Sequence, residues 1–166
     1  MRITKKTKTK DILPLLTAKR LDELLELVPE YDNKSIFSMT IGEFGNFIND
    51  EESFISDFLA NEKNALKAFG TIKAWRNQMK SLTTFMKKFE IPKTNEEAEA
   101  ARGVLFPNFV MKMLLTCANF FGLHSLKEAE SIPVSDWLAV FQDEASRAQY
   151  QAKYNKLIEQ KNKRKK

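Results

Sequence analysis

Apolar residues recur at intervals of three and four along almost the whole chain, and this spacing restricts the fold more than any other feature. Such a period places apolar side chains along one face of an α-helix. No stretch alternates apolar and polar residues over the length of a strand, and five glycines and five prolines in 166 residues leave little material for tight turns. We therefore expect an all-α, single-domain helical bundle of roughly six or seven helices.

Residues 11–152 are expected to form this domain, between a basic N-terminal tail at 1–10 and a basic C-terminal extension at 153–166. With 43% apolar residues the chain is too apolar for general disorder, and it is long enough to bury a core. The first tail has five basic residues and no acid, and the second has seven basic residues and one acid. Such ends attract polyanions or acidic protein surfaces, or they act only as solvated termini, and we expect both to be flexible.

Capping motifs mark where several helices begin. Three sequences place a Ser or Thr three residues before a Glu: Thr40–Glu43, Thr94–Glu97 and Ser125–Glu128. In this capping box the hydroxyl accepts a bond from the Glu N–H, and the carboxylate reaches back to the cap. Ser53 is a further candidate cap. The expected helices lie at about 15–28, 41–49, 54–59, 61–89, 95–103, 108–122 and 134 onward, with a short turn after Ser125.

The segment 61–89 is expected to be the longest helix, and its two faces differ in character. Trp75 and other apolar residues share one face, whereas basic residues gather on the other. A row of bases at helical spacing suits a phosphate backbone, so the basic face is a candidate nucleic-acid-binding surface. Its residues are Lys73, Arg76, Lys80, Lys87 and Lys88.

An internal role for this basic face is the competing interpretation, and we favour it. Residues 11–62, which precede the face, have three basic and twelve acidic residues, a net charge of −9. This acidic segment would lie against the basic face in the same chain or in a neighbouring subunit. Trp75 and Phe89 lie on the apolar face, away from the lysines, which argues against the mixture of stacking and charge that single-strand binders use.

The final helix is expected to leave the core near its end. Trp137 and Phe141 begin a stripe that continues through alanines to Ala152, but beyond Tyr150 the apolar residues move to a different face. A second stripe of this kind needs a partner to cover it. The candidate partner-binding residues are Tyr150, Tyr154, Leu157 and Ile158.

Residues 104–123 are apolar and about as long as a membrane helix. However, a charge near the middle of such a segment is costly in lipid. On a helix this charge, Lys112, shares one narrow polar stripe with Asn108, Thr116 and Asn119. We therefore expect a buried amphipathic helix with Phe120 and Phe121 on its apolar face, and no association with a membrane.

The sequence contains no recognisable catalytic or cofactor-binding motif. It lacks the phosphate loop GxxxxGK[ST] and the dinucleotide motif GxGxxG. One histidine, His124, and one cysteine, Cys117, exclude an HExxH motif, a multi-cysteine metal site and an internal disulfide. Cys117 is expected to be a buried, inert thiol. We expect no enzyme activity, no catalytic, cofactor-binding or metal-binding residue, and no small-molecule substrate.

The segment 120–130, FFGLHSLKEAE, is followed by Ser135-Asp136-Trp137. It resembles small helical bacteriophage proteins, in particular tail-assembly chaperones and similar virion-morphogenesis proteins. In many of these, a helix ends in a short turn, a capped Glu-rich turn follows, and an acid–aromatic pair opens the last helix. The stretch 39–44 is similar. The resemblance covers roughly a quarter of the chain, its motifs are helix caps, and it implies no catalytic residue.

The sequence thus predicts a non-enzymatic helical assembly or protein-interaction protein, whose partner is another protein or a second copy of itself. The resemblance implies a phage tail-assembly chaperone or a virion structural protein. The alternative is a nucleic-acid-binding accessory protein that uses the basic tails and the basic helix face. A single free cysteine and the lack of an export signal favour the cytoplasm, or the host cytoplasm or virion if the protein is of phage origin.

Overall fold

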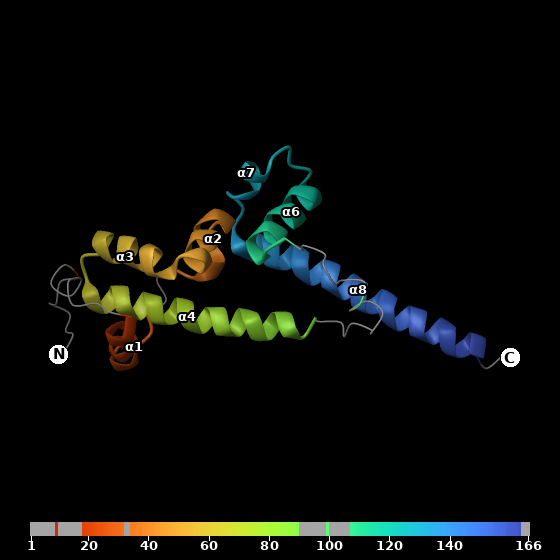
Figure 1. Ribbon diagram of the computed structural model, residues 1–166, viewed down its shortest axis with the longest axis horizontal. Helices are drawn as coiled ribbons and strands as arrows, with labels where there is room; N and C mark the ends of the chain where they lie inside the picture. The colour runs from red at the N-terminus through yellow and green to blue at the C-terminus, as the bar shows by residue number, and fades with distance from the viewer. Residues whose placement is uncertain (1–8, 10–17, 32–33, 90–98, 100–106, 164–166) are drawn as a thin grey trace. The chain divides into compact units, whose positions relative to one another are not determined.

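The structure, a computed structural model, describes residues 9, 18–31, 34–89, 99 and 107–163. These residues form seven α-helices and one 3₁₀ helix, without a β-strand, which confirms the all-α prediction (Figure 1). The predicted cap at Thr94 and the residues of the N-terminal tail other than Thr9 lie outside the described residues. In chain order the elements are α1 (Ala18–Leu27), η3 (Ile36–Ser38), α2 (Ile41–Asn49), α3 (Glu51–Asn61), α4 (Ala65–Lys87), α6 (Phe109–Phe121), α7 (Leu126–Ala129) and α8 (Val134–Lys163).

The chain groups into two compact units, an N-terminal unit of Met1–Leu82 and a C-terminal unit of Thr83–Lys166. The sequence pattern did not indicate this division, because it falls inside the continuous helix α4. Each unit buries its own set of large apolar side chains. The fully buried ones include Ile36, Met39, Ile41, Phe44, Leu59, Phe69, Ile72 and Trp75 in the first unit, and Met113, Cys117 and Val134 in the second.

Trp75 of α4 is the centre of the N-terminal core. Its ring lies 5.8 Å from that of Phe47, 5.7 Å from that of Phe54 and 4.7 Å from that of Phe58, measured between centroids. Its indole Nε1 donates a hydrogen bond to the Lys34 carbonyl at 2.5 Å, so the one polar atom of the side chain is satisfied. Helices α2 and α3 are therefore attached to α4 through aromatic contacts.

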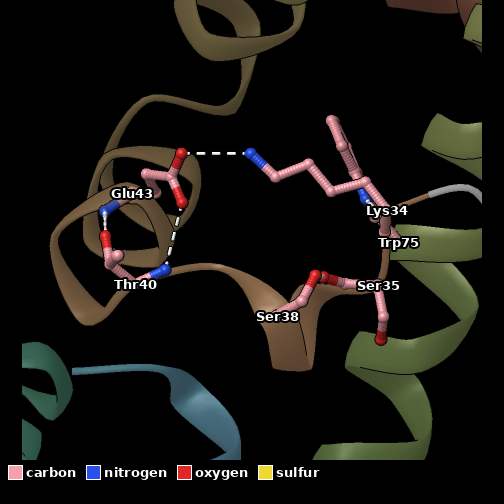
Figure 2. Close-up of polar contacts among 6 residues, drawn as sticks. All are labelled: Lys34, Ser35, Ser38, Thr40, Glu43 and Trp75. Carbon is pink, nitrogen blue, oxygen red and sulfur yellow. Dashed lines mark hydrogen bonds and ion pairs between the residues drawn. The ribbon is translucent and has the colours of Figure 1, made fainter. Parts of the chain in front are cut away.

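The predicted capping box at the start of α2 is confirmed. The Glu43 N–H donates to Thr40 Oγ1 at 3.1 Å, and the Thr40 N–H donates to Glu43 Oε2 at 3.0 Å. Lys34 Nζ lies 3.0 Å from the other carboxylate oxygen of Glu43, as Figure 2 shows. The capping box of α2 is thus also linked, through Glu43, to the loop that precedes η3.

A single residue, Asp50, joins α2 to α3. Its N–H donates to the Asn46 carbonyl at 3.0 Å and closes α2, while its carboxylate accepts from the Ser53 N–H at 3.0 Å and opens α3. The prediction that Ser53 caps α3 is therefore wrong. Asp50 is the cap because it stands three residues before the Ser53 N–H group, to which its carboxylate bonds, and because its negative charge is favoured at a helix N-terminus.

The C-terminal unit packs α6 against α7 and α8. Asn108 caps the start of α6 by accepting from the Met111 N–H at 2.8 Å, and Gly122 ends it in the left-handed conformation, with φ at 64°. A row of rings from Phe109 through Trp137 to Phe141 links α6 to α8, with centroids 5.5 Å and 5.4 Å apart. The predicted boundaries of α6 are confirmed.

The expectation that the apolar face of α6 is buried is wrong in part. Phe120 is 56% exposed and Phe121 is 45% exposed. Helix α6 contacts α7 and α8, and its Met113, Leu114 and Cys117 are buried, but other apolar residues of the helix stay exposed. The exposed apolar residues of α6 are Met111, Leu115, Phe120 and Phe121.

Helix α8, with 30 residues, is longer than α4, with 23, so the prediction that the central helix is the longest is wrong. The expected flexible extension is also helical as far as Lys163. The reason is compositional, since residues 134–163 contain no glycine or proline and are rich in Ala, Gln and Lys. In Figure 1, α6 lies beside the N-terminal part of α8 and α7 lies further from it, and the C-terminal half of α8 extends beyond both.

Candidate protein-interaction surface

The C-terminal half of α8 carries an exposed apolar stripe. Tyr150 is 69% exposed, Tyr154 48%, Leu157 56% and Ile158 38%. From Tyr150 to Asn162 every residue is exposed except the half-buried Ala152. The structure therefore places all four predicted partner-binding residues on one exposed segment, which we call the α8 stripe.

The α8 stripe lies opposite the core-facing side of the same helix. At about 100° per residue, Tyr154, Leu157 and Ile158 fall within a sector of about 100° that includes Tyr150. Phe141 lies about 180° from Tyr150, and it packs against Trp137 and Phe89. One continuous helix thus has two apolar faces, and among the described residues of the unit only the first is packed against side chains from outside α8.

Local contacts hold this segment as a regular helix. Gln149 Nε2 donates to the Lys88 carbonyl at 3.0 Å and attaches the middle of α8 to the chain after α4. Beyond it, Gln151 Nε2 donates to Asn155 Oδ1 at 2.9 Å, and the rings of Tyr150 and Tyr154 stack 6.3 Å apart. Side chains ordered in this way lose less entropy when a partner binds.

The predicted basic face of α4 does not form one uniform exposed surface. Arg76 Nε lies 2.7 Å from Glu51 Oε1 and its Nη1 lies 2.5 Å from Asp22 Oδ1. Lys73 Nζ donates to the Val28 carbonyl at 2.8 Å. Both carboxylates come from the acidic segment 11–62, so for Arg76 the internal interpretation agrees with the structure.

The pKa of Arg76 reflects these contacts. Burial acts to lower the pKa of the guanidinium, but the hydrogen bonds and charges of Glu51 and Asp22 outweigh it and raise the pKa above its ordinary value. The three remaining residues of the face, Lys80, Lys87 and Lys88, are exposed, and Lys80 also interacts within the chain. The structure thus separates the five predicted residues into two that contact the N-terminal unit internally and three that are exposed.

The single cysteine and the single histidine do not come together as a reactive pair. Cys117 is completely buried in α6, and burial, with the charges of Asp136 and Glu144, raises the pKa of its thiol to about 11. His124 is exposed, and its backbone N–H donates to Glu128. A thiol with this pKa is almost entirely protonated at neutral pH and is a poor nucleophile.

Among the described residues, no group of three or more His, Cys, Asp or Glu side chains is placed to hold a metal ion. In the same part of the chain, none of the helices has the length and apolar character needed to cross a membrane.

Sequence reasoning missed a second exposed apolar site, at the end of α1. Leu27 is 73% exposed, more than any other large apolar side chain among the described residues, and Tyr31 nearby in the chain is 48% exposed. The one indication in the sequence is that Leu27 falls outside the stripe that includes Leu25 and Val28, which are buried. A single leucine off a stripe is common on protein surfaces, and for this reason the pattern alone did not select it.

The fold and the α8 stripe define an all-α protein with an exposed amphipathic helix. No protein-family model, no curated protein and no solved structure matches the chain.

Proposed function

We propose that this chain is a non-enzymatic assembly or protein-interaction protein that binds its partner through the α8 stripe. The observation that supports the proposal is the opposition of two apolar faces on α8. Phe141 and Trp137 serve the core, whereas Tyr154 and Leu157 are solvent-exposed. A helix whose only role is to complete the core requires one apolar face, so the second apolar face supports a role in binding.

The chemistry of the α8 stripe suits a protein partner. Two tyrosines combine large apolar rings with hydroxyl groups that remain hydrated or bond to the partner, a property that enriches tyrosine at interfaces. Leu157 and Ile158 add aliphatic surface one turn further along. Spacing at i, i+4, i+7 and i+8 is the pattern by which an amphipathic helix enters a groove or pairs with another helix.

The finer proposal, that the assembly is a phage tail or another part of a virion, rests on the capped segments after Phe120 and around Thr40. The nucleic-acid alternative would use Lys80, Lys87 and Lys88 and the basic ends of the chain. Its candidate surface loses two members, because Lys73 and Arg76 make internal contacts. We therefore place protein binding first.

Site-specific photocrosslinking in the producing cell tests the proposal. A photoreactive phenylalanine derivative replaces Tyr154 on the α8 stripe, and in a matched variant it replaces Glu159, which is exposed about 180° away from Tyr150. We expect a discrete crosslinked species of protein mass from position 154 and none from position 159. Equal crosslinking at both positions, or none at either, would contradict the proposal.

Truncation provides a second readout. A chain that ends at Gln149 keeps the contact with Lys88 and removes the whole α8 stripe. We expect this chain to retain the helical circular dichroism of its remaining residues and to lose the partner. Loss of cooperative unfolding would show that the stripe supports the fold, which would remove the basis of the proposal.

A further inference from the structure

The end of α1 combines an exposed leucine with acidic side chains. Leu27 is 73% exposed, and three glutamates close to it in the chain, Glu23, Glu26 and Glu30, are exposed as well; Glu30 accepts a hydrogen bond from Asn77 Nδ2. These acids stand four and one residues before Leu27 and three residues after it. We call Leu27, Tyr31 and these three glutamates the acidic α1 patch; Lys67 also reaches it, with Nζ 6.0 Å from the centroid of the Tyr31 ring.

The α8 stripe also combines exposed apolar residues with charged ones, here of positive sign. Leu157 is 56% exposed, with Lys153 four residues before it and Lys161 four residues after it, each about 40° from it around the helix, and Lys156 one residue before it, about 100° away. All three lysines are exposed. An apolar centre flanked by bases is therefore present in the C-terminal unit, and an apolar centre flanked by acids is present in the N-terminal unit.

Charge argues against pairing of two α8 stripes with each other. Residues 150–163 contain Lys153, Lys156, Lys161 and Lys163 but one acid, Glu159. Two such helices side by side would juxtapose like charges, which is unfavourable in an interface. An acidic apolar surface avoids this cost and adds attraction during encounter.

We infer that the α8 stripe of one copy binds the acidic α1 patch of a second copy. This inference rests on the proposed function and identifies the partner. The contact would place Leu157 and Tyr154 against Leu27 and Tyr31, with lysines of one copy facing glutamates of the other. Because the two surfaces differ, the contact is heterologous. A pair of copies keeps one free α8 stripe and one free acidic α1 patch, so further copies add until a ring closes or a filament grows.

Charge-swapped variants of the full chain test the inference by sedimentation velocity over a concentration series at low salt. The base-reversed variant carries Lys153→Glu and Lys161→Glu, and the acid-reversed variant carries Glu23→Lys and Glu26→Lys. A control carries Lys87→Glu and Lys127→Glu, with the same change of net charge as the first variant at exposed positions outside both surfaces. Circular dichroism verifies that each variant is folded.

We expect the native chain and the control to associate as the concentration rises, and each reversed variant alone to associate at least about tenfold more weakly. Mixing the two reversed variants should restore association, because each then offers a surface of opposite charge to the other. Raising the salt should weaken the native association and the restored one alike.

Three results would overturn the inference. They are a native chain that stays monomeric at every concentration, a base-reversed variant that associates more tightly than the native chain, and reversed variants that fail to associate when mixed. In each case a crosslink from Tyr154 to a different protein would leave the proposed function standing. Absence of any crosslink from the α8 stripe would remove both.

Discussion

Arg76 on α4 and Glu51 on α3 form an ion pair with 2.7 Å between Nε and Oε1. The same guanidinium reaches Asp22 on α1, so one side chain links α1, α3 and α4. Exposed ion pairs contribute little to stability, but Arg76 is only 30% exposed and makes two such contacts. Its removal leaves two carboxylates beside each other without their cation.

We expect Arg76→Met to lower the free energy of unfolding by about 1–3 kcal/mol, because the two acids then repel and lose their hydrogen bonds. Urea denaturation followed by circular dichroism measures this change. Lys87→Met, at the exposed end of α4, is the matched control and should change the free energy by less than about 0.5 kcal/mol. Equal losses in the two variants would show that the Arg76 contacts contribute nothing specific.

Gly70 permits a close approach between α4 and the chain after α1. The Tyr31 N–H donates to the Gly70 carbonyl at 3.1 Å, and a Cβ at Gly70 would lie 2.7 Å from the Pro29 oxygen and 2.8 Å from Tyr31 Cβ. We expect Gly70→Ala to destabilise the protein by about 1–3 kcal/mol, although alanine is favoured by about 1 kcal/mol in an unconstrained helix. Thermal or urea unfolding measures the difference.

Ser81→Ala, at an exposed position of the same helix, controls for helix propensity. It should leave stability unchanged or raise it by a few tenths of a kcal/mol. A Gly70→Ala variant as stable as Ser81→Ala would mean that the Pro29 and Tyr31 backbone moves away at no cost.

Cys117 should make stability fall at alkaline pH. Burial, with the charges of Asp136 and Glu144, raises the pKa of the folded thiol to about 11, whereas an unfolded cysteine titrates near about 8.5. The raised pKa contributes stability that is fully present below the unfolded value and is lost as the pH rises through the folded one. We expect the stability of the native chain, measured relative to Cys117→Ala, to decrease between about pH 8.5 and about pH 11.

Subtracting the Cys117→Ala curve removes the titration of the lysines and tyrosines, which both chains share. A difference that does not change over this range would contradict the raised pKa. Thiol labelling gives an independent check, since native Cys117 should react with a disulfide reagent far more slowly than the urea-unfolded chain.

Glu43 should make the stability of the protein fall at acidic pH. Burial acts to raise the pKa of its carboxyl, but the bond from the Thr40 N–H and the hydrogen bond and charge of Lys34 lower the pKa below its ordinary value. A lowered pKa contributes stability above the unfolded value, near about 4.3, and this stability is lost as the pH falls through the folded value. The native chain should therefore lose stability relative to Glu43→Gln when the pH drops below about 4.

Glutamine keeps an acceptor for the Thr40 N–H but does not titrate, so the comparison isolates the charge. Urea unfolding of both chains at several pH values between neutral and acidic provides the measurement. Parallel curves throughout would show that the Lys34 and Thr40 contacts do not favour the ionised form.

Much of the fold follows from local chemistry and was predictable for that reason. The caps at Thr40 and Asn108 and the end of α6 at Gly122 depend on residues within one turn of each other. The α8 stripe was predictable too, since a change of helical face is visible in the spacing of Tyr150, Tyr154 and Leu157.

What sequence reasoning missed depends on neighbours. Whether Phe120 lies in the core depends on how much of the apolar face of α6 is covered by α7 and α8. A helical wheel shows which residues share a face but not how much of that face the neighbouring helices cover. Arg76 and Asp22 are 54 positions apart in the sequence. The opposite charges of the two segments therefore predicted an attraction between them, but did not identify the residues that form the contact. Leu27 had no periodic signal, because a single exposed leucine forms no stripe.

The one-residue connection at Asp50 limits how this region can change during evolution. With the same residue ending α2 and starting α3, an inserted or deleted residue here would turn α3 by about 100° relative to α2 and carry Phe54 and Phe58 away from Trp75. Substitutions can accumulate on either helix, but a change of length cannot be absorbed between them. Homologous chains should therefore vary in the number of residues elsewhere and keep the spacing from Phe47 to Phe58 constant.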